Sequence, residues 1–130
     1  MPGEGLAFVQ RQHRRLTSGQ GVSLAIASDD TGEAFGLVIL LARPQPGVAG
    51  LGYWVVPAAR QRGLARRAVG LMTEWGLETF ALIEAWVEPD NDASQRVLAA
   101  NGFQCEGLLR SFLVIRSRRA DVRVYSRIRD

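Results

Sequence analysis

The sequence predicts a single α/β domain built around a mixed β-sheet, and three observations lead to this fold class. The chain has 130 residues, which is an ordinary size for one domain and long enough to bury a core. Hydrophobic residues make up 47% and charged residues 22%, the proportions of soluble globular proteins. Segments with strand-like and helix-like periodicity alternate along the chain, without repeats or linkers, which favours helices packed on a sheet.

The first third of the chain is predicted to form a short helix and a β-hairpin. Leu6 to Leu16 is polar and rich in arginine, with few apolar residues, and we expect a short helix there. Val22 to Ser28 and Glu33 to Ala42 are apolar segments typical of strands. The turn sequence DDTG lies between them, so the two strands are expected to pair as a hairpin.

The middle of the chain is predicted to form a strand–helix–strand unit. Arg43 to Gly50 contains two prolines and two glycines and is expected to be a loop. Leu51 to Val56 is predicted to be a strand. From Gly63 to about Thr79 apolar residues recur on one helical face, and Leu82 to Val87 is a second strand. Such a unit places its two strands parallel with a right-handed crossover.

The last third is predicted to form a short helix and two strands. Asp92 to Ala100 is the helix, with Asn91 or Asp92 as its N-cap and the pair Asn101-Gly102 as its end. Phe103 to Ile115 and Ala120 to Ile128 are the strands, joined by residues 116–119.

Composition bears on several classes of function. With one cysteine, Cys105, and one histidine, His13, an intrachain disulfide is excluded and no metal site is expected. No apolar run approaches the roughly 20 residues of a membrane span, and the N-terminus has no apolar signal core. We therefore expect a cytoplasmic protein without a membrane partner. The net charge of +3 suggests nucleic-acid binding, but interleaved aromatics and a recognisable motif are missing, and this class ranks last.

Residues Pro57 to Ala68 read PAARQRGLARRA and form the turn between the third strand and the long helix. Ligands of open α/β sheets bind at such carboxyl ends of strands. The first turn of a helix leaves about four N–H groups without intrahelical partners, and the helix dipole favours an anion. Gly63 allows close backbone approach. Positive charge comes from four arginines, Arg60, Arg62, Arg66 and Arg67. A pyrophosphate suits this turn, although an ordinary helix start with a solvated arginine face explains the stretch equally well.

A second motif separates these alternatives. The segment EPDNDASQRVL is followed by Asn101-Gly102-Phe103. Together with GYWVVPAARQRGLA, it resembles the GNAT superfamily of acetyl-CoA-dependent N-acetyltransferases, and within it the RimJ/RimL-like branch that acetylates N-termini of ribosomal proteins. The resemblance covers roughly residues 21–128. It implies a mixed, mostly antiparallel sheet with a splayed parallel strand pair and flanking helices.

The resemblance also implies a cofactor site for acetyl-CoA. The family's pyrophosphate loop falls on Arg60, Gly63 and Ala65, and the branch's Asn-x-x-Ser falls on Asn91 and Ser94. Unpaired backbone groups near residues 54–56 would pair with the pantetheine amides, as an added strand pairs with a sheet edge. The full set of implied cofactor-binding residues is Trp54, Val55, Val56, Arg60, Gln61, Arg62, Gly63, Leu64, Ala65, Arg66, Asn91 and Ser94.

For catalysis, the resemblance places Ser94 as the residue that protonates the leaving thiolate. The alternative is a serine that only belongs to the first turn of the helix.

Many members of the superfamily carry a carboxylate on the strand that here runs from Leu51 to Val56, and this strand has no acid. Glu84 and Glu88 are the nearest candidate carboxylates, acting through water, although Glu84 is as easily structural. A missing base favours an acceptor α-amine, whose pKa of about 7.7–8.0 leaves it partly neutral, over a lysine side chain near 10.4.

Relatives normally begin with a further strand and helix before the segment that matches residues 7–18, and these elements help to wall the acceptor site. Their absence predicts a homodimer that covers the strand Val22 to Ser28 or the segment Leu6 to Leu16. It also keeps open a second function, a non-catalytic acyl-CoA-binding module. Side chains predicted to be buried are Trp54, Trp75, Trp86 and Cys105, with Tyr53 and Trp54 as alternative lining of the acyl channel.

Overall fold

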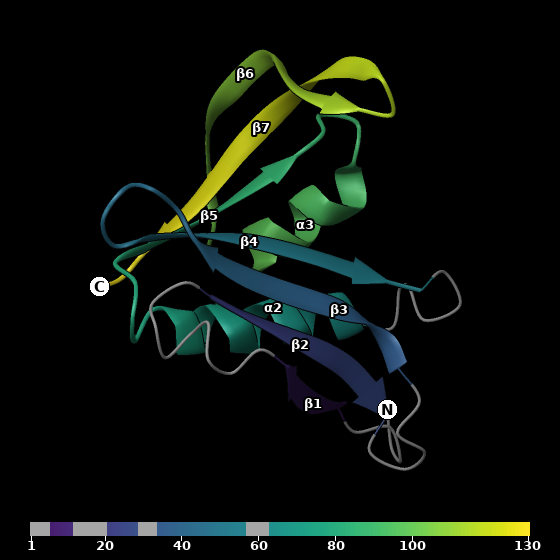
Figure 1. The fold of residues 1–130 in the computed structure, drawn as a ribbon, viewed down its shortest axis with the longest axis vertical. Coiled ribbons are helices and arrows are strands. Elements are labelled where there is room, and N and C mark those ends of the chain that lie inside the picture. Colours follow the sequence, from purple (N-terminus) through teal and green to yellow (C-terminus); the bar gives the residue numbers. More distant parts are fainter. Residues whose placement is uncertain (1–5, 12–20, 29–33, 57–62) are drawn as a thin grey trace.

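The computed structural model describes residues 6–11, 21–28, 34–56 and 63–130. Seven strands form one sheet in the order β1-β2-β3-β4-β5-β7-β6 (Figure 1). Every neighbouring pair is antiparallel except β4 and β5. The strands are β1 (Leu6–Arg11), β2 (Gly21–Ser28), β3 (Ala34–Ala42), β4 (Val48–Val55), β5 (Leu82–Val87), β6 (Gln104–Ile115) and β7 (Arg118–Ile128).

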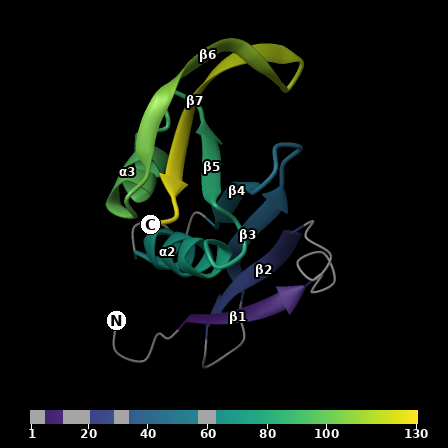
Figure 2. The ribbon, with the colours of Figure 1, turned by 90° about the vertical axis from the view of Figure 1, so that its left-hand side faces the viewer.

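Of the two described helices, α2 (Leu64–Gly76) connects β4 to β5, and α3 (Asp92–Ala100) connects β5 to β6. α2 packs against β3 and β4, and α3 lies next to α2 (Figure 2). The Asn91 side chain caps α3 by accepting a hydrogen bond from the backbone N–H of Ser94. Gly102 ends α3 with φ +83°, a conformation that glycine adopts without steric cost.

β4 and β5 separate after a short parallel contact. Their register joins Val48 to Leu82, Ala49 to Ile83 and Gly50 to Glu84, and no further pair joins them in the described residues. Beyond this point the two strands diverge (Figure 1). The predicted strand–helix–strand unit with a splayed parallel pair is therefore confirmed.

The main core lies between the helices and one face of the sheet. α2 contributes an apolar stripe with the spacing of a helix face, and β5 contributes alternate residues. Its fully buried side chains include Ile26, Val38, Leu40, Val69, Met72, Ile83 and Leu98. Because β5 turns alternate residues to this core, Glu84 and Trp86 face the other side of the sheet.

The β6–β7 hairpin extends beyond the other strands and curls over at its tip (Figure 1). Arg116 and Ser117, both with positive φ, form a two-residue turn between Ile115 and Arg118, so β7 starts two residues earlier than predicted. Within β6 the register slips between Leu109 and Leu113, and Ser111 has φ +53°. Asp121 accepts a hydrogen bond from Ser111 N at 2.8 Å and Arg119 Nε donates to Ser111 O at 2.9 Å, which fixes this bend.

Several sequence predictions are wrong. Leu6–Arg11 is a strand and not a helix, because all six residues pair with β2, and this tertiary pairing outweighs local propensity. β2 is therefore an interior strand, which removes the expectation that its edge forms a dimer contact. β4 begins at Val48, inside the predicted loop, because residues 48–50 pair with β5 and Ala49 and Gly50 also pair with β3. Residues 12–16 and the turn at 29–32 lie outside the described residues.

Two side chains predicted to be buried are exposed. Trp54 is 55% exposed, because Tyr53 and Val55, its neighbours along β4, take the face that packs on the helices. Cys105 is exposed because it lies on β6, the last strand of the sheet. None of the described helices has the length and apolarity needed to cross a membrane.

Candidate active site

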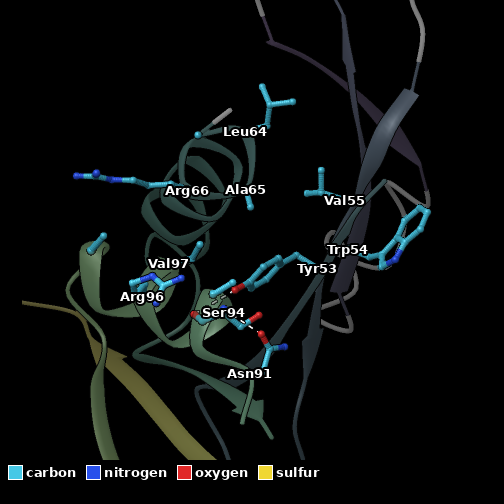
Figure 3. Close-up of a pocket in the computed structure, with 13 residues that line it drawn as sticks. Tyr53, Trp54, Val55, Leu64, Ala65, Arg66, Asn91, Ser94, Arg96 and Val97 are labelled. Atoms are coloured by element: carbon cyan, nitrogen blue, oxygen red, sulfur yellow. Dashed lines mark hydrogen bonds between the residues drawn. The ribbon is translucent and has the colours of Figure 1, made fainter. Parts of the chain in front are cut away.

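A cavity of about 760 Å³ opens between the end of β4 and the first turns of α2 and α3 (Figure 3). Gly63 precedes α2 with φ +75°, and no side chain caps the helix. A Cβ at Gly63 would meet nothing within 4 Å, so the backbone borders open space. The first turn of α2 holds no acidic residue, and the charged residues of the described lining are Arg66 and Arg96. This geometry fits an anion such as a pyrophosphate.

The first turn of α3 forms the opposite wall of this cavity. Asn91 and Ser94 both line it, and the Tyr53 ring reaches across from β4 to meet them (Figure 3). The Tyr53 hydroxyl donates a hydrogen bond to the Ser94 carbonyl oxygen at 3.3 Å. Burial raises the pKa of the Tyr53 phenol, and the hydrogen bond at Ser94 lowers it in part, so the phenol is protonated at neutral pH.

A second cavity, of about 280 Å³, adjoins the first at Tyr53, Asn91 and Ser94. The three residues line both cavities. The rest of its described lining comes from β4, β5, α3 and the β6–β7 hairpin: Leu51, Gly52, Ala85, Trp86, Val87, Glu88, Leu98, Leu113, Ile115 and Val122. The two cavities therefore meet where β4 and β5 separate.

Glu84 lies outside the lining of both cavities. It occupies the paired end of β5, and its Oε1 is 3.2 Å from Arg43 Nε. The Arg43 guanidinium also lies 4.2 Å from the centre of the Trp86 ring. Glu88, in contrast, borders the second cavity, and its Oε2 lies 3.7 Å from Arg118 Nη2.

The structure brings most of the predicted cofactor-binding residues together. Those that line the larger cavity are Trp54, Val55, Gly63, Leu64, Ala65, Arg66, Asn91 and Ser94. The Trp54 side chain points away from the cavity (Figure 3), so this residue borders it through its backbone. Val56 N donates to Phe35 O at 2.7 Å, and its backbone donor is thus already used within the sheet. Arg60, Gln61 and Arg62 lie outside the described residues.

Sequence reasoning missed most of the second cavity. The sequence predicts Tyr53 only as alternative lining of the acyl channel, and its position next to both cavities depends on the hydrogen bond that it makes from β4 to α3. Gly52 and the hairpin residues carry no motif. Their common location depends on the pairing of β5 with β7, whose partners lie 36 to 46 positions apart in the chain, and on the pairing of β7 with β6. No local pattern reports these pairings.

Comparison with known proteins identifies the family. The model of the acetyltransferase (GNAT) domain matches residues 2–104. The uncharacterized N-acetyltransferase YoaA of Bacillus subtilis is 32% identical over 126 residues, which are 95% of this chain and 71% of that protein.

Solved structures share the fold. The ribosomal-protein-S5-alanine acetyltransferase of Vibrio fischeri matches with a TM-score of 0.83 and 25% identity, covering 90% of this chain and 66% of that one. RimJ of Mycobacterium smegmatis, in complex with CoA-disulfide, matches with a TM-score of 0.79 and 27% identity. The match covers 88% of this chain and 56% of that one. A spermidine N-acetyltransferase of Vibrio cholerae, with a TM-score of 0.76 and 18% identity, is similar in fold only. The match covers 89% of this chain and 69% of that one. The chain thus spans less than two thirds of the two ribosomal-type structures. The family match and the similarity to YoaA show that the chain belongs to the GNAT family of acetyltransferases, which take the acetyl group from acetyl-CoA. The splayed strands and the uncapped start of α2 agree with this assignment.

Proposed function

We propose that this protein transfers the acetyl group of acetyl-CoA to a primary amine, namely the N-terminal α-amine of a protein or peptide. The observation that carries the proposal is the meeting of two cavities at Tyr53, Asn91 and Ser94. One cavity suits the coenzyme and the other suits the acceptor. The two substrates can therefore be present together, and the amine can attack the thioester directly.

In this proposal the pyrophosphate binds at the start of α2. The N–H groups that follow Gly63 have no side-chain cap, and an anion satisfies them. Arg66 and Arg96 add positive charge at the rim. The pantetheine arm then follows β4 toward Asn91, past Gly50, the last residue of β4 that pairs with β5.

The chemical step needs a neutral amine, a polarised thioester and a proton for the leaving group. The amine nitrogen attacks the thioester carbonyl carbon, a C–N bond forms and the C–S bond breaks. Ser94, which lines both cavities, donates its hydroxyl proton to the thiolate. The nitrogen loses one proton through water, and this proton restores the serine. The products are an amide and free coenzyme A thiol.

The absence of an acid along β4 supports an α-amine as the acceptor. An α-amine with a pKa of about 7.7–8.0 is partly neutral near pH 7.5, whereas a lysine amine is almost entirely charged. The same absence is the observation that favours the second candidate, a module that binds acyl-CoA without catalysis.

One assay tests both candidates. Thiol release from acetyl-CoA is followed with a panel of peptides that have free α-amines, and acetyl-CoA binding is measured separately by calorimetry. Acetylated peptide and free thiol in equal amounts support the transferase. Binding of acetyl-CoA without thiol release for any peptide in the panel supports the binding module instead.

A further inference from the structure

We propose that the second cavity selects an acceptor with one positive charge next to an apolar group, and that Glu88 binds the amine of this acceptor. The inference rests on the proposed function, because it names the acceptor that the same active site takes. It also assigns Arg118 a role, as the partner that Glu88 holds when no acceptor is bound.

Most residues in the described lining of the second cavity have apolar side chains, although polar and apolar atoms share its surface about equally. Leu51, Ala85, Val87, Leu98 and Val122 are all buried residues. Trp86 also belongs to the lining, and its ring is held in place from two sides. Phe112 meets it edge to face at 5.2 Å, and the Arg43 guanidinium lies over its ring. An apolar side chain entering this space leaves water for a preformed apolar surface, which is favourable.

Glu88 is the one charged residue in the described lining of this cavity. It directly follows β5, near the point where the two cavities meet. Its carboxylate is one-third exposed, and its partner Arg118 is two-thirds exposed, so the 3.7 Å ion pair is a weak one. An incoming α-ammonium group can therefore replace the guanidinium at little cost and form a charge-assisted hydrogen bond. It then releases one proton to water, and the resulting neutral amine attacks the thioester.

This distribution of charge discriminates between acceptor classes. A single carboxylate matches a single amine, while the further charges of a polyamine such as spermidine would be buried without partners, which is costly. A peptide that begins with Asp or Glu would bring its own carboxylate toward Glu88 and be repelled. A peptide that begins with an apolar residue meets neither penalty.

Gly52 offers a direct way to test the location. It lines the second cavity, and a Cβ at this position would meet nothing within 4 Å. Gly52→Val therefore fills acceptor space without a clash inside the protein, and valine suits a strand. Gly107 on β6 provides the matched control, since its Cβ would also meet nothing within 4 Å and it lies outside the described lining of both cavities.

The experiment compares octapeptides that begin with Leu or with Asp, and spermidine, as acceptors for the full chain. KM for the acceptor, KM for acetyl-CoA and binding of the Leu peptide to the coenzyme A-loaded protein are measured. We expect the Leu peptide to be preferred at least tenfold in kcat/KM. Glu88→Gln should raise its KM about tenfold through loss of a charged hydrogen bond, while Arg118→Gln lowers it a few-fold. Gly52→Val should abolish peptide binding but not acetyl-CoA binding.

Two controls define the alternatives. Glu78→Gln removes an exposed charge outside both cavity linings, and this variant and Gly107→Val should behave as the unmodified protein. The inference is overturned if an amine is acetylated but spermidine or the Asp peptide is preferred, or if Glu88→Gln and Gly52→Val leave peptide KM and binding unchanged. Absence of any acetylation together with normal acetyl-CoA binding would instead count against the proposed transferase, and peptide binding to the loaded protein would still decide the location of the site.

Discussion

The two cavities that meet at Tyr53 are built from different parts of the chain and by different means. The larger cavity lies near two helix starts, and its described lining falls within the segment from Tyr53 to Ala100. The second cavity is lined by residues from four strands, from α3 and from the segment between β5 and α3, and two of those strands form the β6–β7 hairpin. In our proposals the first cavity binds an anion through N–H groups at a helix start, and the second selects its ligand by shape and one charge. Coenzyme binding would then depend on local geometry, and acceptor binding on how distant strands are arranged.

Ser94 belongs to both cavities, and its substitution should have the largest effect. Ser94→Ala should lower kcat about 100-fold or more, because the proton is needed only as the thiolate leaves. KM for acetyl-CoA should change little, and the Asn91 cap remains because it uses the backbone N–H of residue 94. Steady-state kinetics at saturating acetyl-CoA measures this. An unchanged kcat would limit Ser94 to a place in the helix turn.

Gly63 belongs to the larger cavity alone. Gly63→Val should weaken acetyl-CoA binding at least tenfold, because a side chain would stand in the space before α2 and because valine resists a φ of +75°. Gly102→Val is the matched control. Gly102 also has positive φ, but its Cβ would face Arg127, so this variant should lose stability and keep its affinity. Calorimetry measures the affinity of both variants for acetyl-CoA. An equal loss of affinity in Gly63→Val and Gly102→Val would assign the effect to backbone strain.

The bend in β6 should affect the second cavity alone. Asp121→Ala removes the acceptor for Ser111 N, and we expect about a threefold rise in acceptor KM with unchanged acetyl-CoA affinity, because Leu113 and Ile115 lose their fixed position. Unfolding in urea should show a loss of roughly 1 kcal/mol. Ser111→Gly keeps both backbone hydrogen-bonding groups and suits the positive φ, so it should leave acceptor KM as it is.

Tyr53 separates the cavities and should give the smallest effect. Tyr53→Phe keeps the ring between β4 and α3 and removes the 3.3 Å hydrogen bond to the Ser94 carbonyl. We expect about a twofold decrease in kcat and a stability loss of about 0.5–1 kcal/mol. A decrease as large as that of Ser94→Ala would instead make the phenol the proton donor, consistent with its raised pKa.

The same contrast explains what could be predicted from the sequence. β5 and α3 have the predicted bounds, because alternation, an N-cap at Asn91 and a glycine at position 102 are local signals. The larger cavity follows from a motif on these elements. The strand at Leu6–Arg11 and the exposure of Trp54 depend instead on which strand or helix lies opposite. The second cavity depends on a bend in β6 and on pairing across the sheet, and neither has a signature in one segment.

The open space beside Gly52 has a consequence for how this fold diversifies. A single nucleotide change can place a new side chain there, and its Cβ would meet nothing within 4 Å. Gly52 belongs to the lining of the second cavity and not to that of the larger one, so in our proposal such a change alters the acceptor space and leaves the coenzyme space as it is. The amine that is modified can then change on one scaffold while the acetyl donor stays the same.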